Sequence, residues 1–356
     1  MRIVAVDDSA EFRERYEERL SQGPTRRVIA VAPAVDPNAT GVVDHSPDLV
    51  LVDYQLNERQ ESGGFASYKG PTLAALLREK LPTTPILLVS RKGLMSPKRL
   101  AQVREIEGAF DDLVYKEDIF SAPTKFWRDV ELLVAGYVTL KRGRKTREGL
   151  VRLLGATKDE ADSLLAADPP LEVLQGVPWR VSAIARWIRH TVLLFPGVLY
   201  DALHAGVALG ISPSGFSGVD VQRYLRRAKY VGPFGPPDGR WWKRRILEGG
   251  HRMLSRAAVD SASTLDFRIA WQKVMGTRLL PTRCVTSWRK PADCVCYVLK
   301  RPAALEYSLP YRPDNRPAIM DEARISFRAI RESNDYEEHL VAPEARDRLR
   351  AILLEG

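Results

Sequence analysis

Five polar residues stand at the ends of apolar runs in the first third of this 356-residue chain: Asp7, Asp8, Asp53, Ser90 and Lys116. Three carboxylates in one place repel one another, and each raises the pKa of the others. A divalent cation relieves that repulsion, and an all-oxygen site suits Mg²⁺. With the metal and Lys116 neutralising a phosphoryl group and Ser90 hydrogen-bonding to it, Asp53 is a candidate nucleophile for forming an acyl phosphate.

The elements that must position these residues alternate regularly. Helical patterns separate short, β-branched, apolar runs, so the sequence predicts a parallel sheet that is covered by helices on both faces. The carboxyl ends of parallel strands share one edge of the sheet, where the five polar residues should meet. The predicted strands are Ile3–Val6, Val28–Ala32, Leu49–Val52, Ile86–Val89 and Leu113–Tyr115, and the predicted helices are Glu11–Leu20, Pro71–Leu81, Pro97–Ile106 and one from Pro123 towards Leu140.

Residues 1–135 resemble the receiver domains of two-component signalling. The resemblance rests on Asp7 and Asp8 after the first strand, VLVDYQL around Asp53, LLVS before Arg91 and LVYK ending at Lys116. It implies a flavodoxin-like, doubly wound sheet of five parallel strands. The alternative is an ordinary sheet of the same architecture whose strands end in polar residues by chance.

The resemblance also implies roles for individual residues. Asp53 would accept phosphate from a histidine kinase or a phosphotransfer protein. Asp7, Asp8, Asp53 and the backbone carbonyl of Gln55 would hold Mg²⁺. Ser90 and Lys116 would contact the phosphoryl group, so the only catalysis expected is self-phosphorylation and dephosphorylation of the receiver.

The chain departs from the family pattern at several positions. Arg91 stands where the family prefers a small residue, and it can crowd or gate the phosphate. Glu117 replaces the usual proline, which puts the usual cis turn after the lysine in doubt. Leu113 stands where an aromatic switch residue is frequent. The loop between Asp53 and Gly70 is longer than usual, and its residues 57–69 form a lid, a kinase-specific contact or a tolerated insertion.

The remainder of the chain has a different character. Residues 1–135 contain 18 Lys and Arg against 21 Asp and Glu, a net charge of −3. Since the whole chain has a net charge of +9, the remaining residues have a net charge of +12. We expect a basic linker or helix extension at 136–149, which includes KRGRKTR. Residues 150–356 should form a mainly helical effector region of unknown family, with a small hairpin made by Val285–Trp288 and Cys294–Leu299.

Three outputs remain open for residues 150–356. Docking on another protein is the first. DNA binding is the alternative, through a helix-turn-helix near 202–228 and a basic cluster beside Trp241 and Trp242. An enzymatic output is the third, although no phosphate loop, nucleophile elbow or kinase motif is present. The candidate nucleic-acid contacts are Arg223, Arg226, Arg227, Arg240, Lys243, Arg244 and Arg245.

Other features bound the setting of the protein. The apolar stretch 191–211 contains Pro196 and Asp201 near its centre, so we expect buried helices there rather than a membrane span. Three cysteines, Cys284, Cys294 and Cys296, are too few for a disulfide framework. A cytoplasmic location is the default expectation. The sequence does not decide whether the protein forms a homodimer.

Overall fold

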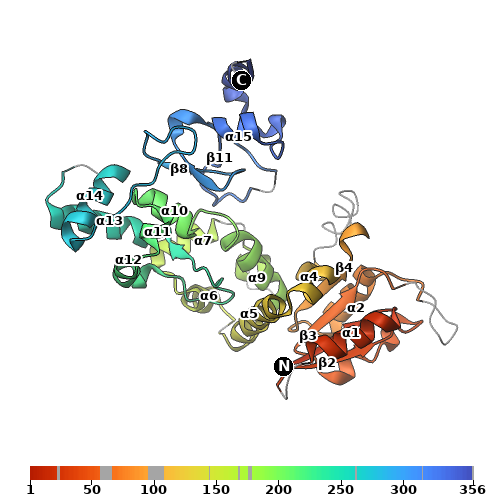
Figure 1. The fold of residues 1–356 in the computed structure, drawn as a ribbon. Coiled ribbons are helices and arrows are strands. Elements are labelled where there is room, and N and C mark those ends of the chain that lie inside the picture. The colour runs from red at the N-terminus through yellow and green to blue at the C-terminus, as the bar shows by residue number, and fades with distance from the viewer. Residues whose placement is uncertain are drawn as a thin grey trace. The chain divides into compact units, whose positions relative to one another are not determined.

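The computed structural model describes residues 1–21, 25–56, 66–94, 108–143, 145–166, 169–174, 179–260, 263–314 and 316–354. The chain divides into two compact units, which Figure 1 shows in colours that follow the sequence. The N-terminal unit contains Met1–Leu150 and Pro170–Trp187, and the C-terminal unit contains Val151–Pro169 and Ile188–Gly356. The predicted helix Pro97–Ile106 and most of the segment 57–69 lie outside the described residues.

A five-stranded parallel sheet forms the centre of the N-terminal unit, in the order β2-β1-β3-β4-β5. This is the strand order of the flavodoxin-like fold, and it confirms the predicted fold class. The strands are β1 Arg2–Val6, β2 Arg27–Val31, β3 Leu49–Asp53, β4 Ile86–Ser90 and β5 Asp112–Tyr115.

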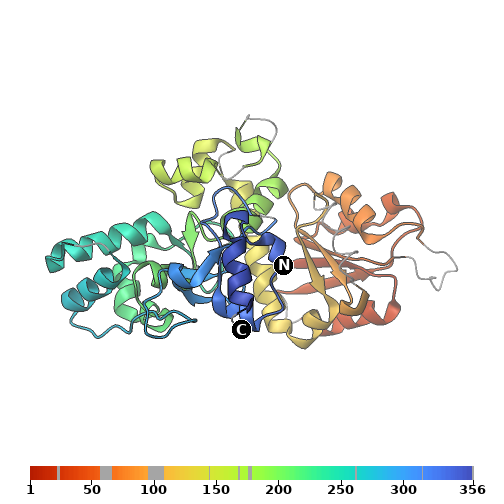
Figure 2. The ribbon, with the colours of Figure 1, turned by 90° about the horizontal axis from the view of Figure 1, so that it is seen from above.

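Burial explains why these strands read as continuous apolar runs. Every residue of β3 and of β4 is buried, because helices cover both faces of the sheet (Figure 2). The helix α1, Ala10–Leu20, buries Phe12, Tyr16 and Leu20, which recur every four residues and so share one face. The predicted helices Glu11–Leu20 and Pro71–Leu81 correspond to α1 and to Gly70–Lys80, whereas only two short 3₁₀ turns, Pro37–Ala39 and Val42–His45, separate β2 from β3.

Two further helices follow the last strand directly. The helix α4, Lys116–Ser121, begins at the residue after β5, and α5, Pro123–Arg142, begins two residues after α4 ends. Proline at the first position of α5 suits the start of a helix. Since α5 continues to Arg142, residues 136–142 extend a helix of the sheet unit. Within the same unit, α5 packs against α9, Val181–Trp187.

A buried carboxylate fastens several of these elements together. Asp111 accepts a hydrogen bond from the backbone N–H of Ile86, 2.7 Å away, and forms an ion pair of 2.6 Å with Arg78 of α2, Gly70–Lys80. The hydroxyl of Tyr137 in α5 also donates to Asp111. A charge this deeply buried is tolerated only when several donors satisfy it. Asp111 thus ties α2, β4 and α5 to one another.

The C-terminal unit is mainly helical and contains a small sheet of order β10-β11-β8-β9. Its longest helices, α13 and α14, pack side by side (Figures 1 and 2). The helices of this unit include α7 Lys158–Leu165, α10 Ala202–Ala208, α11 Pro213–Phe216, α12 Val219–Tyr224, α13 Lys243–Ala257, α14 Thr264–Met275, α15 Phe327–Glu332 and α16 Arg346–Leu354, and α6 Arg147–Leu154 spans the boundary between the units.

The small sheet differs in detail from the predicted hairpin. Cys294–Cys296, which is β8, pairs with β9, Arg301–Ala303, rather than with Val285–Trp288. The chain reverses just before β9, where Lys300 takes the left-handed φ of 48°. The Trp288 side chain is 71% exposed, so it lacks the burial that a strand of this sheet would give it. The remaining strands are β10 Ser308–Pro310 and β11 Arg324–Ser326.

The apolar stretch 191–211 is interrupted, as its polar residues predict. A short strand, β6 Leu199–Tyr200, separates a π-helical turn from α10. Asp201 is the N-cap of α10, and its carboxylate accepts a hydrogen bond from the backbone N–H of His204. Across the described residues, no helix has the length and apolar character that a membrane crossing requires.

The start of α2 depends on a glycine. Gly70 packs so closely against the end of β3 that a Cβ there would lie 2.0 Å from the backbone oxygen of Asp53. Gly70→Ala must therefore displace α2 or the strand end, and we expect it to destabilise the protein by about 1–3 kcal/mol or more. Thermal unfolding followed by circular dichroism measures the loss. Gly93→Ala is the matched control, because a Cβ at Gly93 meets nothing within 4 Å; an equal effect of both variants would contradict the packing argument.

Candidate functional site

A buried lysine joins the acidic residues at the carboxyl edge of the sheet. The Lys116 ammonium lies 2.7 Å from Oδ2 of Asp7 and 3.2 Å from Oδ1 of Asp53. Lys116 occupies the first position of α4, directly after β5, while Asp7 follows β1 and Asp53 ends β3. The three residues therefore meet because β1, β3 and β5 are parallel strands of one sheet and end at the same edge.

The three predicted carboxylates form one cluster. Oxygen atoms of Asp7, Asp8 and Asp53 all lie within 4.8 Å of one another, and all three residues are buried. Among the described residues, this is the one group of His, Cys, Asp or Glu side chains that is close enough to hold a metal ion. Lys116 pairs with Asp7 and Asp53, and a cation bound among the three carboxylates would add further positive charge.

Local hydrogen bonds orient the aspartates that follow β1. Oδ1 of Asp7 accepts a hydrogen bond of 3.0 Å from the backbone N–H of Ser9. The Arg13 guanidinium, from the first turns of α1, donates at 2.8 Å to the backbone carbonyls of both Asp7 and Asp8. Arg13 was not predicted from the sequence; its position five residues after Asp8, one helical turn into α1, was the available signal.

Burial raises the pKa of two of the carboxyl groups. For Asp53, loss of solvent is the largest cause and the Asp7 charge is the next, and together they raise the pKa to about 7 despite the opposing effect of Lys116. Burial likewise raises the pKa of Asp7, and Lys116 only partly offsets it. The cluster thus holds its full negative charge only at a cost, as the sequence argument expects.

The other predicted site residues lie beside this cluster in sequence and fold. Ser90 is the last residue of β4, next to β3 in the sheet, and its side chain is buried. Among the described residues, its hydroxyl makes one long contact, of 3.4 Å, with the backbone oxygen of Arg91. Gln55 is half-buried in the loop two residues after Asp53. The predicted roles of Ser90 in phosphate binding and of Gln55 in Mg²⁺ binding stay predictions.

An aromatic ring supports the cations around the site. The Lys116 ammonium lies 4.0 Å from the centre of the Phe12 ring, and the exposed Arg91 guanidinium lies 4.8 Å from the same centre. Arg15 approaches that ring at 5.3 Å. Cations are attracted to the face of an aromatic ring, so Phe12 keeps Arg91 close to Lys116. Phe12 was not predicted as a site residue from the sequence.

The segment after Lys116 takes a different course from the family's cis turn. No peptide bond among the described residues is cis, so the chain passes from Lys116 to Glu117 in trans. The Glu117 carboxylate accepts hydrogen bonds from the backbone N–H of Lys92 at 3.2 and 3.3 Å. The Lys92 ammonium forms an ion pair of 2.6 Å with Asp118. Glu117 thus links the start of α4 to the segment after β4.

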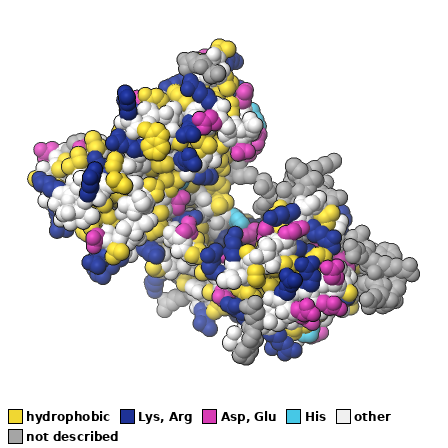
Figure 3. Space-filling view, in the orientation of Figure 1, with side chains coloured by type: hydrophobic (Ala, Val, Ile, Leu, Met, Phe, Trp, Pro, Cys, Tyr) yellow, Lys and Arg dark blue, Asp and Glu magenta, His cyan; other side chains and the backbone are white. Residues whose placement is uncertain are grey.

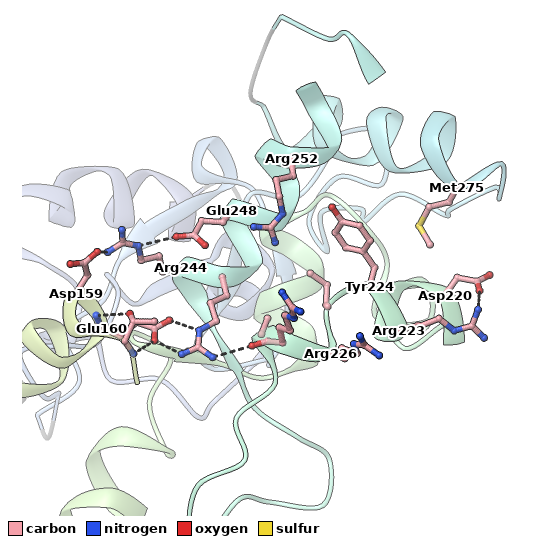
Figure 4. A pocket seen from close by; sticks show the side chains of 15 residues that line it. Asp159, Glu160, Asp220, Arg223, Tyr224, Arg226, Arg244, Glu248, Arg252 and Met275 are labelled. Atoms are coloured by element: carbon pink, nitrogen blue, oxygen red, sulfur yellow. Dashed lines mark hydrogen bonds and ion pairs between the residues drawn. The ribbon is translucent and has the colours of Figure 1, made fainter. Parts of the chain in front are cut away.

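In the C-terminal unit, five of the predicted nucleic-acid residues line one cavity of about 1150 Å³ (Figure 4). They are Arg223, Arg226, Arg227, Arg244 and Arg245. The predicted second helix of the helix-turn-helix is divided: α12 ends at Tyr224, and Arg226–Ala228 form a separate 3₁₀ turn, η5. The sequence pattern did not reveal that break, which occurs at the buried Leu225.

The rest of the basic cluster has structural roles. Arg240 donates to the backbone oxygens of Leu193 and Gly239, and Lys243 forms an ion pair of 2.6 Å with Asp321. Trp241 and Trp242 are 4% and 1% exposed, so neither ring is available to stack on a base. The expectation that these tryptophans support nucleic-acid binding is therefore wrong: their rings pack in the interior of the unit.

The raised pKa of Asp53 predicts a pH dependence of stability in metal-free protein. Folding raises this pKa to about 7, so the folded state binds more protons than the unfolded state between about pH 4 and 7. Stability should therefore fall as the pH rises through this window. Asp53→Asn should reduce the fall and be more stable than the original protein above pH 7.

Thermal unfolding in EDTA, at several pH values from 5 to 8 chosen to span this window, measures the effect. Asp44→Asn, which removes an exposed carboxylate of the same unit, serves as the control. If the two variants show the same pH dependence, the raised pKa of Asp53 is not its source.

No protein-family model matches this chain, and no curated protein matches it. Solved structures do resemble its N-terminal part. The signal receiver domain of a modulated diguanylate cyclase from Desulfovibrio desulfuricans G20 is 16% identical over 38% of this chain and 94% of that chain, with a TM-score of 0.30. A LuxR-family two-component response regulator from Aurantimonas sp. SI85-9A1 is 21% identical over 38% and 85%, also with a TM-score of 0.30.

The response regulator domain of Thermotoga maritima CheB is 17% identical over 37% of this chain and 93% of that chain, with a TM-score of 0.29. None of these three structures covers more than 38% of this chain. At sequence identities this low, the similarity describes the fold and says nothing of function. The N-terminal unit has the strand order of the flavodoxin-like fold. The solved structures that it resembles are response-regulator receiver domains.

Proposed function

We propose that this protein is a response regulator whose receiver domain, residues 1–135, is phosphorylated at Asp53. The single observation that carries the proposal is the buried Lys116 ammonium held between Asp7 and Asp53, with Asp8 in the same cluster. A phosphoryl group that arrives at Asp53 therefore meets a fixed positive charge that is already in place, which is the preorganised arrangement that phosphoryl transfer needs.

The chemistry follows from the side chains present. An oxygen of ionised Asp53 attacks the phosphorus of a phosphohistidine or of a small phosphoryl donor, and the bond from phosphorus to the donor breaks as the new bond forms. Lys116 then pairs with a phosphoryl oxygen instead of with the free carboxylate. The Ser90 hydroxyl, which makes only a long contact in the unphosphorylated protein, is available to donate to another phosphoryl oxygen.

The acidic cluster fits a magnesium ion. Three buried carboxylates within 4.8 Å provide hard oxygen ligands. Burial first, and the neighbouring Asp7 charge second, raise the pKa of Asp53 to about 7, and a bound cation would oppose both effects. Asp7, Asp8, Asp53 and the backbone carbonyl of Gln55 are the proposed ligands. Bound Mg²⁺ supplies positive charge that favours ionised Asp53 and the incoming phosphoryl oxygens.

The C-terminal unit is the proposed output. Docking on another protein is the first proposal, because a phosphorylated receiver can act by changing a contact surface. The second is binding of DNA, which is supported by the C-terminal charge of +12 and by arginines that line a common cavity. DNA binding through phosphates must weaken steeply with salt. If the full chain fails to bind random duplex DNA at low salt, docking on a protein remains.

The phosphoacceptor has a direct test. In Mg²⁺, acetyl phosphate should add one phosphoryl group to the protein, and beryllofluoride should occupy the same position; Asp53→Ala should abolish both. Intact-protein mass spectrometry and ¹⁹F nuclear magnetic resonance measure the two. Asp129→Ala, which removes an exposed carboxylate of α5, should leave both unchanged. If Asp53→Ala is still modified to the same extent, the assignment of Asp53 is wrong.

The metal site is tested at Asp8. Asp8→Asn should weaken Mg²⁺ binding by about tenfold or more. Substituting a residue that merely supports a metal ligand already weakens metal binding by about this factor. Without metal, the same variant should melt at a higher temperature, because one of three mutually repelling charges is gone. Isothermal titration calorimetry and thermal unfolding measure the two effects, with Asp118→Asn as an exposed control. An unchanged Mg²⁺ titration in Asp8→Asn would exclude this residue as a ligand.

A further inference from the structure

The cavity in the C-terminal unit has an unusual distribution of charge. Six arginines and four acidic residues line it, together with Tyr224 and Met275. The arginines are Arg223, Arg226, Arg227, Arg244, Arg245 and Arg252, and the acidic residues are Asp159, Glu160, Asp220 and Glu248. On the face drawn in Figure 3, Lys and Arg side chains stand out from the surface of this unit.

All four acidic residues are paired with only three of the arginines. Arg244 lies 2.5 Å from Asp159 and 3.0 Å from Glu248. Arg245 lies 2.5 Å from Glu160, and Arg223 makes a longer contact of 3.8 Å with Asp220. In these ion pairs, some of which Figure 4 shows, every acidic side chain of the cavity wall already has an arginine partner.

Three arginines are left without an acidic partner among the described residues. Arg226 and Arg227 belong to η5, and Arg252 belongs to α13. Each side chain is exposed, and each residue lines the same cavity. In Figure 4, Arg226 and Arg252 reach the cavity from these two different elements. A ligand with several negative charges could pair with these three arginines, since guanidinium groups bind phosphate well.

The backbone that carries these arginines is firmly held. Arg245 donates hydrogen bonds to the backbone oxygens of Arg227, at 3.0 Å, and of Gly155, at 2.6 Å, while it pairs with the buried Glu160. Gly249 allows α13 to approach η5 closely, because a Cβ there would lie 2.8 Å from Cδ2 of the buried Leu225. The cavity is therefore a built feature of the unit, and its unpaired arginines project from a fixed frame.

An aromatic side chain completes the wall. The Tyr224 ring meets the fully buried Trp271 edge to face, with 5.1 Å between ring centres, so its orientation is fixed. Tyr224 itself is only half-buried, and the Met275 side chain lies on the same wall. A fixed ring and a polarisable thioether form a surface on which a planar group can stack.

We propose that this cavity binds a phosphorylated small molecule of the nucleotide class. The phosphates would pair with Arg226, Arg227 and Arg252, and the base would pack against Tyr224 and Met275. A cavity of about 1150 Å³ is large enough for such a ligand. Reading duplex DNA usually requires a helix that enters the major groove, and α12, Val219–Tyr224, has only 6 residues. This site is separate from Asp53 and goes beyond the proposed phosphorylation.

The test is a titration of the full chain with fluorescent N-methylanthraniloyl derivatives of ATP and GTP, followed by anisotropy at low and high salt. EDTA in the buffer prevents metal-dependent binding at the aspartate cluster, and Asp53→Ala should bind equally well. Unlabelled pyrophosphate and a single-stranded oligonucleotide serve as competitors. Circular dichroism verifies that each variant is folded.

The variant Arg226→Ala, Arg227→Ala, Arg252→Ala should weaken nucleotide binding at least about tenfold, since even one lost charge-assisted contact has about this effect. The matched control is Arg289→Ala, Arg301→Ala, Arg346→Ala, which removes three exposed arginines from the same unit and should change binding less than about twofold. Tyr224→Leu should weaken the nucleotide by about fivefold but leave competition by pyrophosphate unchanged.

Three results would overturn the proposal. The first is no binding of either nucleotide at low salt. The second is an equal loss of nucleotide binding in both triple variants, which would mean that binding depends on the net charge of the protein and not on these three arginines. The third is displacement of the nucleotide by the oligonucleotide at far lower concentration than by unlabelled nucleotide, which would assign the cavity to nucleic acid. None of these outcomes depends on whether Asp53 is phosphorylated.

Discussion

Repulsion among three buried carboxylates is the constraint on which the N-terminal unit depends. Asp7, Asp8 and Asp53 lie together at the sheet edge, and Lys116 pairs with two of them, Asp7 and Asp53. Burial makes the repulsion worse, because water cannot screen the charges, and the pKa of Asp53 rises to about 7. The fold therefore holds an unfavourable arrangement whose relief requires added positive charge or a change at Asp53.

The sheet supports this arrangement from the inside. Fully buried strands β3 and β4 fix the backbone on which Asp53 and Ser90 stand, and Asp111 ties the neighbouring helices to the sheet. Lys116 is the first residue of α4, and α5 begins two residues after α4 ends. The acidic cluster is thus rigid on one side and adjoins a helix start on the other.

Most of this unit could be predicted from the sequence, because its information is local. Strands covered on both faces appear in the sequence as apolar runs, and polar residues at the carboxyl ends of four of the five strands indicate the shared edge. Contacts made across the fold were not predictable in the same way: Phe12 beneath Lys116 and Arg91, or Glu117 bonding to Lys92, depends on side-chain directions that spacing does not fix. The pairing of Arg245 with Glu160, far apart in sequence, is a further example.

The path of the chain between the two units has a consequence for how the protein can be divided. Residues Val151–Pro169 belong to the C-terminal unit, but Pro170–Trp187 returns to the N-terminal unit, where α9 packs against α5. A cut after residue 135 would also remove Tyr137, whose hydroxyl bonds to Asp111. No single break in the gene separates the two compact units cleanly. Recombination that exchanges whole modules would therefore have to move both segments together, and the two units are expected to evolve as one inherited piece.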